Sequence, residues 1–111
     1  MMLPINWDKI NTFVDSNDLF KRAACSMKNY LRTYFQDDEA NFLEDFRADW
    51  DTVLNTYRFE NAGISFSRDF LRELDYVSVW IRIYDTEDDY VGEYTLFFDE
   101  QLNVIDDTLR R

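Results

Sequence analysis

The stretch that decides the fold is "YVSVWIRIYDTEDDYVGEYTLFF", residues 76–98. Residues 76–84 and 90–98 are rich in β-branched and aromatic side chains, and aliphatic residues occupy every second position of the first run. A period of two places successive side chains on opposite faces of an extended chain, so both runs are typical of β-strands. The five residues "DTEDD" between them are all polar and predict the loop of an antiparallel hairpin.

Pairing across this loop determines which side chains share a face of the sheet. We expect Tyr84 to lie opposite Tyr90, and Trp80 to lie opposite Tyr94. This register separates an aromatic face from a mainly aliphatic face. The aromatic face comprises Tyr76, Trp80, Tyr84, Tyr90, Tyr94 and Phe98, and the other face comprises Val77, Val79, Ile81, Ile83, Val91 and Phe97.

Two arrangements of such a sheet are open from the sequence. In the first, the helices pack on the aromatic face and the chain ends cover the aliphatic face. In the second, the aromatic face stays partly open, and tyrosine and tryptophan are the residue types that anchor protein interfaces. A register shift of one residue would exchange the two faces.

Upstream of the hairpin the apolar residues recur at spacings of three and four. This period predicts three helices, over residues 7–14 with Asn6 as cap, 20–34 and 42–57. Beyond Gly63 we expect a short strand at 64–67, one or two helical turns from a Ser67 cap to Leu74, and a last strand at 102–106. The fold class is therefore α+β: three N-terminal helices packed on a C-terminal antiparallel sheet of three to four strands, in a single domain spanning 1–111.

Charge is distributed unevenly along the chain. The formal net charge is −11, although 46% of the residues are hydrophobic. Residues 1–36 carry five basic and three acidic side chains, whereas residues 37–111 carry seven basic and twenty acidic ones. Such a field repels nucleic acid and anionic membranes and attracts cationic partners. An acidic surface that serves only solubility is the alternative interpretation.

The residues that most enzymatic chemistry needs are missing. The chain has no histidine, which removes the usual general base and most zinc and iron sites. Its two glycines cannot form a phosphate-binding loop. The carboxylates at positions 85, 87, 88 and 89 crowd one loop tip, where each stays hydrated, and they match only part of a calcium loop. We therefore expect no enzymatic activity, no metal and no cofactor.

The single cysteine and the N-terminus indicate the cellular compartment. Cys25 has no partner for a disulfide within the chain and lies in an apolar run, where we expect a small buried side chain rather than a nucleophile. The N-terminal residues lack the pattern of a signal peptide, and no apolar run is long enough for a membrane span. These features favour a cytoplasmic protein.

The closing segment "YVGEYTLFFDEQLNVIDDTL", residues 90–109, carries a family resemblance. Its pattern is Gly92 and Tyr94 on one strand, Asp99 at the turn, and Ile105-Asp106-Asp107 on the next strand. With these features the chain resembles the small acidic immunity proteins of bacterial contact-dependent growth inhibition and related polymorphic toxin systems. The resemblance implies a cytoplasmic protein that binds one cognate toxin domain, often a nuclease, and occludes its active site or substrate groove.

The sequence therefore favours a protein that binds a basic toxin or nuclease domain, as a monomer in a heterodimer, with no direct contact to nucleic acid or membrane. One alternative is an acidic nucleic-acid mimic that blocks a defence nuclease. Another is a cone-like domain that binds a small ligand between helices and sheet, in a pocket lined by Trp50, Tyr57, Trp80 and Tyr94. The acidic face of the third predicted helix, with Glu44, Asp45, Asp49 and Asp51, is a second candidate contact. The residues expected to contact the partner are Tyr84, Asp85, Glu87, Asp88, Asp89, Tyr90 and Glu93.

Overall fold

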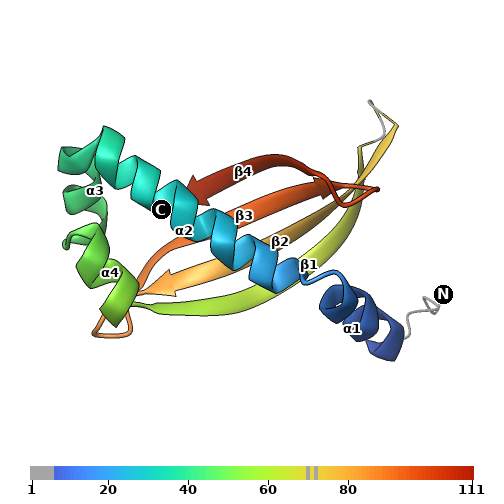
Figure 1. Ribbon diagram of the computed structural model, residues 1–111, viewed down its shortest axis with the longest axis horizontal. Helices are drawn as coiled ribbons and strands as arrows, with labels where there is room; N and C mark the ends of the chain where they lie inside the picture. The colour runs from blue at the N-terminus through green and yellow to red at the C-terminus, as the bar shows by residue number, and fades with distance from the viewer. Residues whose placement is uncertain (1–6, 70, 72) are drawn as a thin grey trace.

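The computed structural model describes residues 7–69, 71 and 73–111, which form helices followed by one antiparallel sheet (Figure 1). Its sheet is a meander with the strand order β1-β2-β3-β4. The α+β class and the order of helices before strands agree with the sequence-based expectation. The elements are α1 (Trp7–Ser16), α2 (Leu19–Asp37), α3 (Glu39–Phe46), α4 (Trp50–Thr56), β1 (Arg58–Asp69), β2 (Leu74–Tyr84), β3 (Tyr90–Asp99) and β4 (Val104–Arg110).

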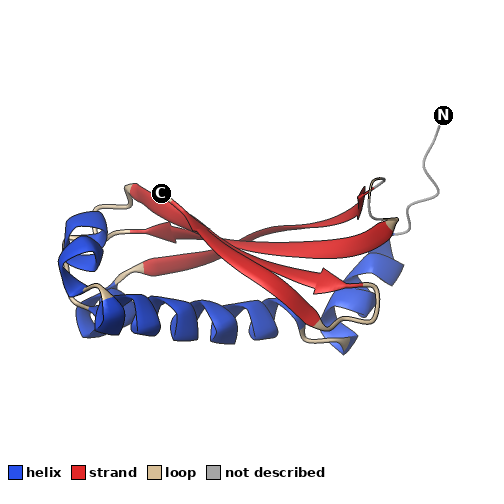
Figure 2. Cartoon of the chain, turned by 90° about the horizontal axis from the view of Figure 1, so that it is seen from above, coloured by secondary structure: helices blue, strands red, loops and turns tan. Residues whose placement is uncertain are grey.

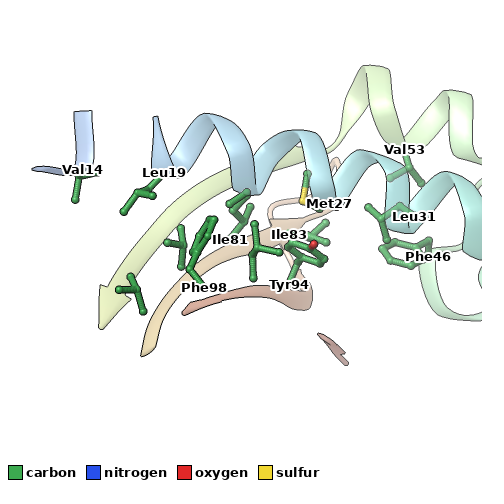
Figure 3. Packing of buried hydrophobic residues seen from close by; sticks show 14 of the residues in the cluster. Val14, Leu19, Met27, Leu31, Phe46, Val53, Ile81, Ile83, Tyr94 and Phe98 are labelled. Carbon is green, nitrogen blue, oxygen red and sulfur yellow. The ribbon is translucent and has the colours of Figure 1, made fainter. Parts of the chain in front are cut away.

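The long helix α2 runs along one face of the sheet, with α1 at one of its ends and α3 and α4 at the other (Figure 1 and Figure 2). Four side chains of α2, spaced four residues apart, are fully buried against the sheet: Leu19, Ala23, Met27 and Leu31. They meet a row of buried side chains from β2 and β3 (Figure 3). Burying a side chain of this size contributes about 1.5–3 kcal/mol, so this two-layer core is the main source of stability. The buried sheet residues are Val77, Val79, Ile81, Ile83, Tyr94, Leu96 and Phe98.

A β-bulge changes the register expected for the central hairpin. Tyr84 pairs with Tyr90 as predicted, but the next pair is Ile83 with Gly92, which leaves Val91 as an extra residue in β3. One extra residue reverses the alternation of all the side chains that follow. Beyond the bulge, Ile81 therefore pairs with Tyr94 rather than Trp80 with Tyr94.

The faces of the sheet are corrected accordingly. Tyr94 and Phe98 lie on the helix side with the aliphatic residues of β2, and Phe97 lies on the other side. The expectation that the helices pack on an aromatic face is thus wrong, because they cover the face with Val77 and Ile81. A face without helices does remain, and it carries fewer aromatic side chains than predicted.

The third predicted helix is two helices, α3 and α4. Arg47 ends α3 in the left-handed conformation, with φ of 59°. The carboxylate of Asp49 then accepts a hydrogen bond from the backbone N–H of Thr52 at 2.9 Å and caps α4. An aspartate that satisfies a free backbone donor in this way starts a new helix instead of continuing the old one.

Several boundaries also differ from the sequence-based prediction. The first strand is much longer than residues 64–67, since β1 has 12 residues. Ser67 lies within β1 and Leu74 begins β2, so the helical turns expected between them are wrong at both ends, while Phe70 lies outside the described residues. Asn6 also lies outside them. Cys25 is exposed on α2 rather than buried, because the buried positions of that helix are two residues away on either side.

Candidate protein-binding surface

The two groups of acidic residues singled out in the sequence lie at the same end of the molecule. The loop between β2 and β3 lies beside α4, at the end where α3 also lies (Figure 1). Asp85 of this loop is close enough to Tyr57, directly after α4, for its charge to raise the pKa of that phenol, although burial raises it more. We call this part of the molecule, residues 37–51 together with 85–90, the acidic end. These residues include eleven acidic side chains and one basic one, Arg47, and two of the carboxylates bind Arg58 and Arg111 from outside these ranges.

The carboxylate of Asp85 accepts hydrogen bonds within its own loop. Its Oδ1 atom accepts hydrogen bonds from the backbone N–H groups of Glu87 at 2.9 Å and Asp89 at 3.0 Å. The backbone closes the loop with bonds from Asp88 N–H to the carbonyl of Asp85 at 3.0 Å and from Asp85 N–H to the carbonyl of Asp89 at 2.9 Å. Asp85 therefore has a structural role in the turn, and an aspartate at the first position of a turn is a known sequence signal for it.

Asp88 and Tyr84 are contacted by an arginine from β1. Arg58 contacts Asp88 Oδ1 through Nη2 at 2.7 Å and Glu60 Oε2 through Nη1 at 2.9 Å. Its guanidinium carbon lies 4.1 Å from the centre of the Tyr84 ring. The hydrogen bond with Asp88 is the largest cause of the raised pKa of Arg58. Both predicted contact residues are thus engaged within the chain, by a residue that the sequence did not single out.

Glu93 belongs to the sheet rather than to the loop tip. It pairs with Arg82 in the ladder, and its Oε2 lies 3.4 Å from Nε of that arginine. The side chain of Glu93 is only 21% exposed. Its carboxylate therefore balances Arg82 on the helix-free face and is less accessible than the carboxylates of the loop.

Three of the predicted contact residues at the loop tip have side chains that neither Arg58 nor the turn engages: Glu87, Asp89 and Tyr90. All are exposed, and Tyr90 keeps 53% of its surface in solvent. Within the part of the chain that the structure describes, the carboxylates of Glu87 and Asp89 have no hydrogen bond or ion pair. Tyr90 leans on Tyr84 edge to face, with ring centres 6.2 Å apart. Two hydrated carboxylates flanking a supported tyrosine can bind a cationic and partly apolar surface.

The acidic residues of α3 and α4 also divide into those engaged within the chain and those that are accessible. Asp45 binds the hydroxyl of Tyr34 and the guanidinium of Arg111, and Asp49 caps α4. Burial, together with the hydrogen bond to Asp45, raises the pKa of Tyr34 to about 12. Glu44 and Asp51 are exposed, and their carboxylates have no hydrogen bond or ion pair among the described residues. They extend the accessible carboxylates of the acidic end beyond the loop.

The helix-free face of the sheet is the second candidate surface. Trp80 lies flat across β1, where a Cβ at Gly63 would come within 2.4 Å of the indole ring. The rings of Tyr76 and Phe97 are 6.2 Å apart on the same face. We define the helix-free face by its ladder residues: Arg58, Glu60, Gly63, Ser65, Ser67, Tyr76, Ser78, Trp80, Arg82, Tyr84, Glu93, Thr95, Phe97, Asp99, Asp106, Thr108 and Arg110.

The pocket expected for a small ligand is not assembled by the four residues predicted to line it. Trp80 and Tyr94 lie on opposite faces of the sheet, because Tyr94 pairs with Ile81. A cavity of about 460 Å³ lies between α1 and the ends of β1 and β2, and none of the four residues lines it. Its walls include Phe13, Phe66 and Leu102. Among the described residues no group of three or more metal-ligating side chains is present.

Comparison with known proteins gives no family assignment. No protein family matches the chain, and neither a similar curated protein nor a similar solved structure was found. Within the described residues no helix is both long and apolar enough to cross a membrane. The function has to be inferred from the two surfaces.

Proposed function

We propose that this protein is a cytoplasmic, immunity-type inhibitor that binds and neutralises a basic toxin domain, with a nuclease as the expected target. The observation that carries the proposal is the acidic end, where accessible carboxylates and an exposed tyrosine lie at the same end of the molecule. Glu44, Asp51, Glu87 and Asp89 supply charge that the fold does not use, and Tyr90 supplies an apolar contact.

The chemistry of a nuclease supports this choice of partner. A nuclease groove must be cationic, because it holds the phosphates of its substrate. Carboxylates on a rigid support can occupy such a groove and exclude the nucleic acid. The formal net charge of −11 also accelerates encounter with a cationic domain at low ionic strength.

The test is neutralisation of a toxin encoded beside this gene. We expect a neighbouring gene to encode a protein with a basic toxin domain, and we expect that domain to arrest growth when expressed alone. Coexpression of this protein should restore growth, and the purified proteins should bind with one toxin domain per chain, measured by calorimetry. Growth arrest that persists in the presence of the folded protein would contradict the proposal.

Matched variants locate the interface on the acidic end. Asp89→Ala combined with Tyr90→Ala removes one accessible carboxylate and the exposed ring of the loop. Glu44→Ala combined with Asp51→Ala removes two accessible carboxylates of the helices. We expect the loop pair to weaken binding about 10–100-fold, because a desolvated anchor affects the dissociation rate, whereas the helix pair mainly slows association. A larger loss from the helix pair would move the interface to α3 and α4.

A further inference from the structure

The helix-free face differs in charge from the rest of the molecule. Its ladder residues include three arginines and four acidic residues, so its formal net charge is −1, on a chain with a net charge of −11. The charges are also paired within the face: Arg58 binds Glu60 at 2.9 Å, and Arg82 contacts Glu93 at 3.4 Å. A second copy of this chain is therefore repelled by the surface as a whole but not by this face.

The centre of the face carries half-buried aromatic side chains. Gly63 leaves room for the Trp80 indole to lie against β1, where any larger residue would push it outward. Tyr76 and Phe97 pack against each other beside it. Small hydroxyl residues occupy five further ladder positions, with Thr95 paired to Thr108 across β3 and β4, and charged residues occupy most of the others. Two sheet faces pack on one another at about 10 Å, with their strands at about −30°.

From these observations we propose that the helix-free face binds a second copy of the chain and forms a two-fold symmetric dimer. A strongly basic partner gains little attraction from this face, because its three arginines offset three of its four acidic residues. The second copy fits because it offers the same aromatic centre and the same mixture of arginine and carboxylate to itself. This inference is independent of the proposed toxin binding. It replaces the monomer expected from the sequence by a dimer in which the acidic end of each chain is a separate site for a toxin domain.

The area of the face sets the strength of the dimer. Four strands about 4.8 Å apart, with about seven residues each at about 3.3 Å, give a flat area of roughly 450 Å². This is about half of the roughly 800 Å² per partner that a standard interface buries. We therefore expect a dimer that dissociates on dilution and is populated at concentrations of about 100 µM.

The two proposed interfaces differ in how their affinity depends on salt. Association of two chains that each carry −11 should become stronger as salt screens their repulsion, whereas binding of a basic partner at the acidic end should become weaker. The dimer should thus tighten between about 50 mM and about 500 mM salt, where the Debye length falls from about 14 Å to about 4 Å. A dimer that dissociates in salt would not be held by this face.

The experiment is sedimentation equilibrium on the purified chain and on two matched variants. Thr108→Glu adds a carboxylate at an exposed position of the helix-free face, and Thr33→Glu adds the same group at an exposed position of α2. We expect the wild-type mass to rise from 13.5 kDa toward twice that value with concentration, and Thr33→Glu to behave alike. Thr108→Glu should shift the dissociation constant at least tenfold, with an unchanged melting temperature.

Each other outcome overturns the proposal. A wild-type chain that stays monomeric up to about 1 mM, a concentration at which even a weak specific dimer is populated, has no such interface. Equal effects of Thr108→Glu and Thr33→Glu would show that added charge, rather than this face, controls association. A wild-type monomer whose toxin binding is lost in Thr108→Glu would assign the face to the toxin.

Discussion

The two tight loops of the sheet share one backbone conformation and differ in what surrounds them. In the β2–β3 loop Asp85 accepts hydrogen bonds from backbone N–H groups two and four residues later, and in the β3–β4 loop Asp99 does the same at 2.9 Å to Gln101 and to Asn103. The fourth residue is left-handed in both loops, with φ of 64° at Asp88 and 62° at Leu102.

Their surroundings are opposite. Leu102 packs against the core, and its carbonyl accepts a hydrogen bond from Nη2 of Arg22 at 2.9 Å. Asp88 points into solvent and is 73% exposed, with Arg58 as its partner. The comparison shows which acids the fold requires: the first aspartate of each loop. Glu87 and Asp89 are required by neither the turn nor the core, so they are the residues that a binding function has to explain.

Substitutions at the fourth position should give the largest difference between the two loops in the free energy of unfolding. Leu102→Gly relieves the left-handed strain but removes apolar packing, so we expect a loss of about 2 kcal/mol in the free energy of unfolding. Asp88→Gly relieves the same strain and removes only an exposed ion pair, so we expect a change within about 0.5 kcal/mol. Urea denaturation measures both, and equal losses would mean that Leu102 does not anchor its loop.

Substitutions at the first position should lower the stability of the protein by the same amount in both loops. Asp85→Ala and Asp99→Ala each remove the Oδ1 atom that accepts two hydrogen bonds from backbone N–H groups, which we expect to cost about 1–2 kcal/mol. Asparagine retains an oxygen acceptor, so Asp85→Asn and Asp99→Asn should recover most of this loss. Thermal unfolding of the four variants tests the point. A stable Asp85→Ala would leave its carboxylate available for binding after all.

Neutralising Glu87 and Asp89, which neither the turn nor the core requires, should affect association rather than folding. Glu87→Gln with Asp89→Asn should leave the free energy of unfolding within about 0.5 kcal/mol of the wild type. The on-rate for the basic partner should fall about threefold at low salt, because both charges are near the proposed contact. The control, Glu100→Gln with Asp106→Asn, removes the same charge near the other loop and should change the on-rate less. Stopped-flow kinetics distinguishes the pairs, and equal effects would indicate steering by net charge alone.

The smallest expected effect concerns the alkaline limit of stability. Burial and, to a lesser degree, the charge of Asp85 raise the pKa of Tyr57 above its ordinary value near 10. A raised pKa favours folding below the unfolded pKa, and this contribution is lost as pH rises through the folded pKa. Asp85→Asn should move that loss to lower pH, whereas Asp99→Asn should not. Absorbance titration of tyrosine ionisation provides the measurement, and an identical shift in both variants would exclude the charge of Asp85 as its cause.

Much of the sheet could be predicted from the sequence, because apolar and polar residues alternate along a strand when one of its faces is buried. The "DTEDD" loop and the Tyr84–Tyr90 pair follow from it. The bulge at Val91 could not be predicted, since a single extra residue leaves no change in composition, yet it places Tyr94 and Phe98 on the opposite face. The break between α3 and α4 had a signal in Asp49, a residue type favoured at helix N-termini.

The candidate surface was predictable only in part. The acids of the loop are evident in the sequence, and the turn role of Asp85 could have been recognised from its position before "TEDD". The pairing of Asp88 with Arg58 joins residues 30 positions apart, so it depends on the path of β1 along β2. Whether a carboxylate is accessible therefore depends on tertiary structure more than on local pattern.

The position of the acidic end also has a consequence for rotation in solution. The molecule is 47 Å long, and its excess negative charge lies toward one end. Such a particle has a permanent electric dipole, and an approaching cationic domain exerts a torque on it before the two touch. At physiological salt the screening length is about 8 Å, so the far end contributes little to this torque. Encounters are therefore pre-aligned, and the partner searches over fewer orientations than it would against a uniformly charged protein.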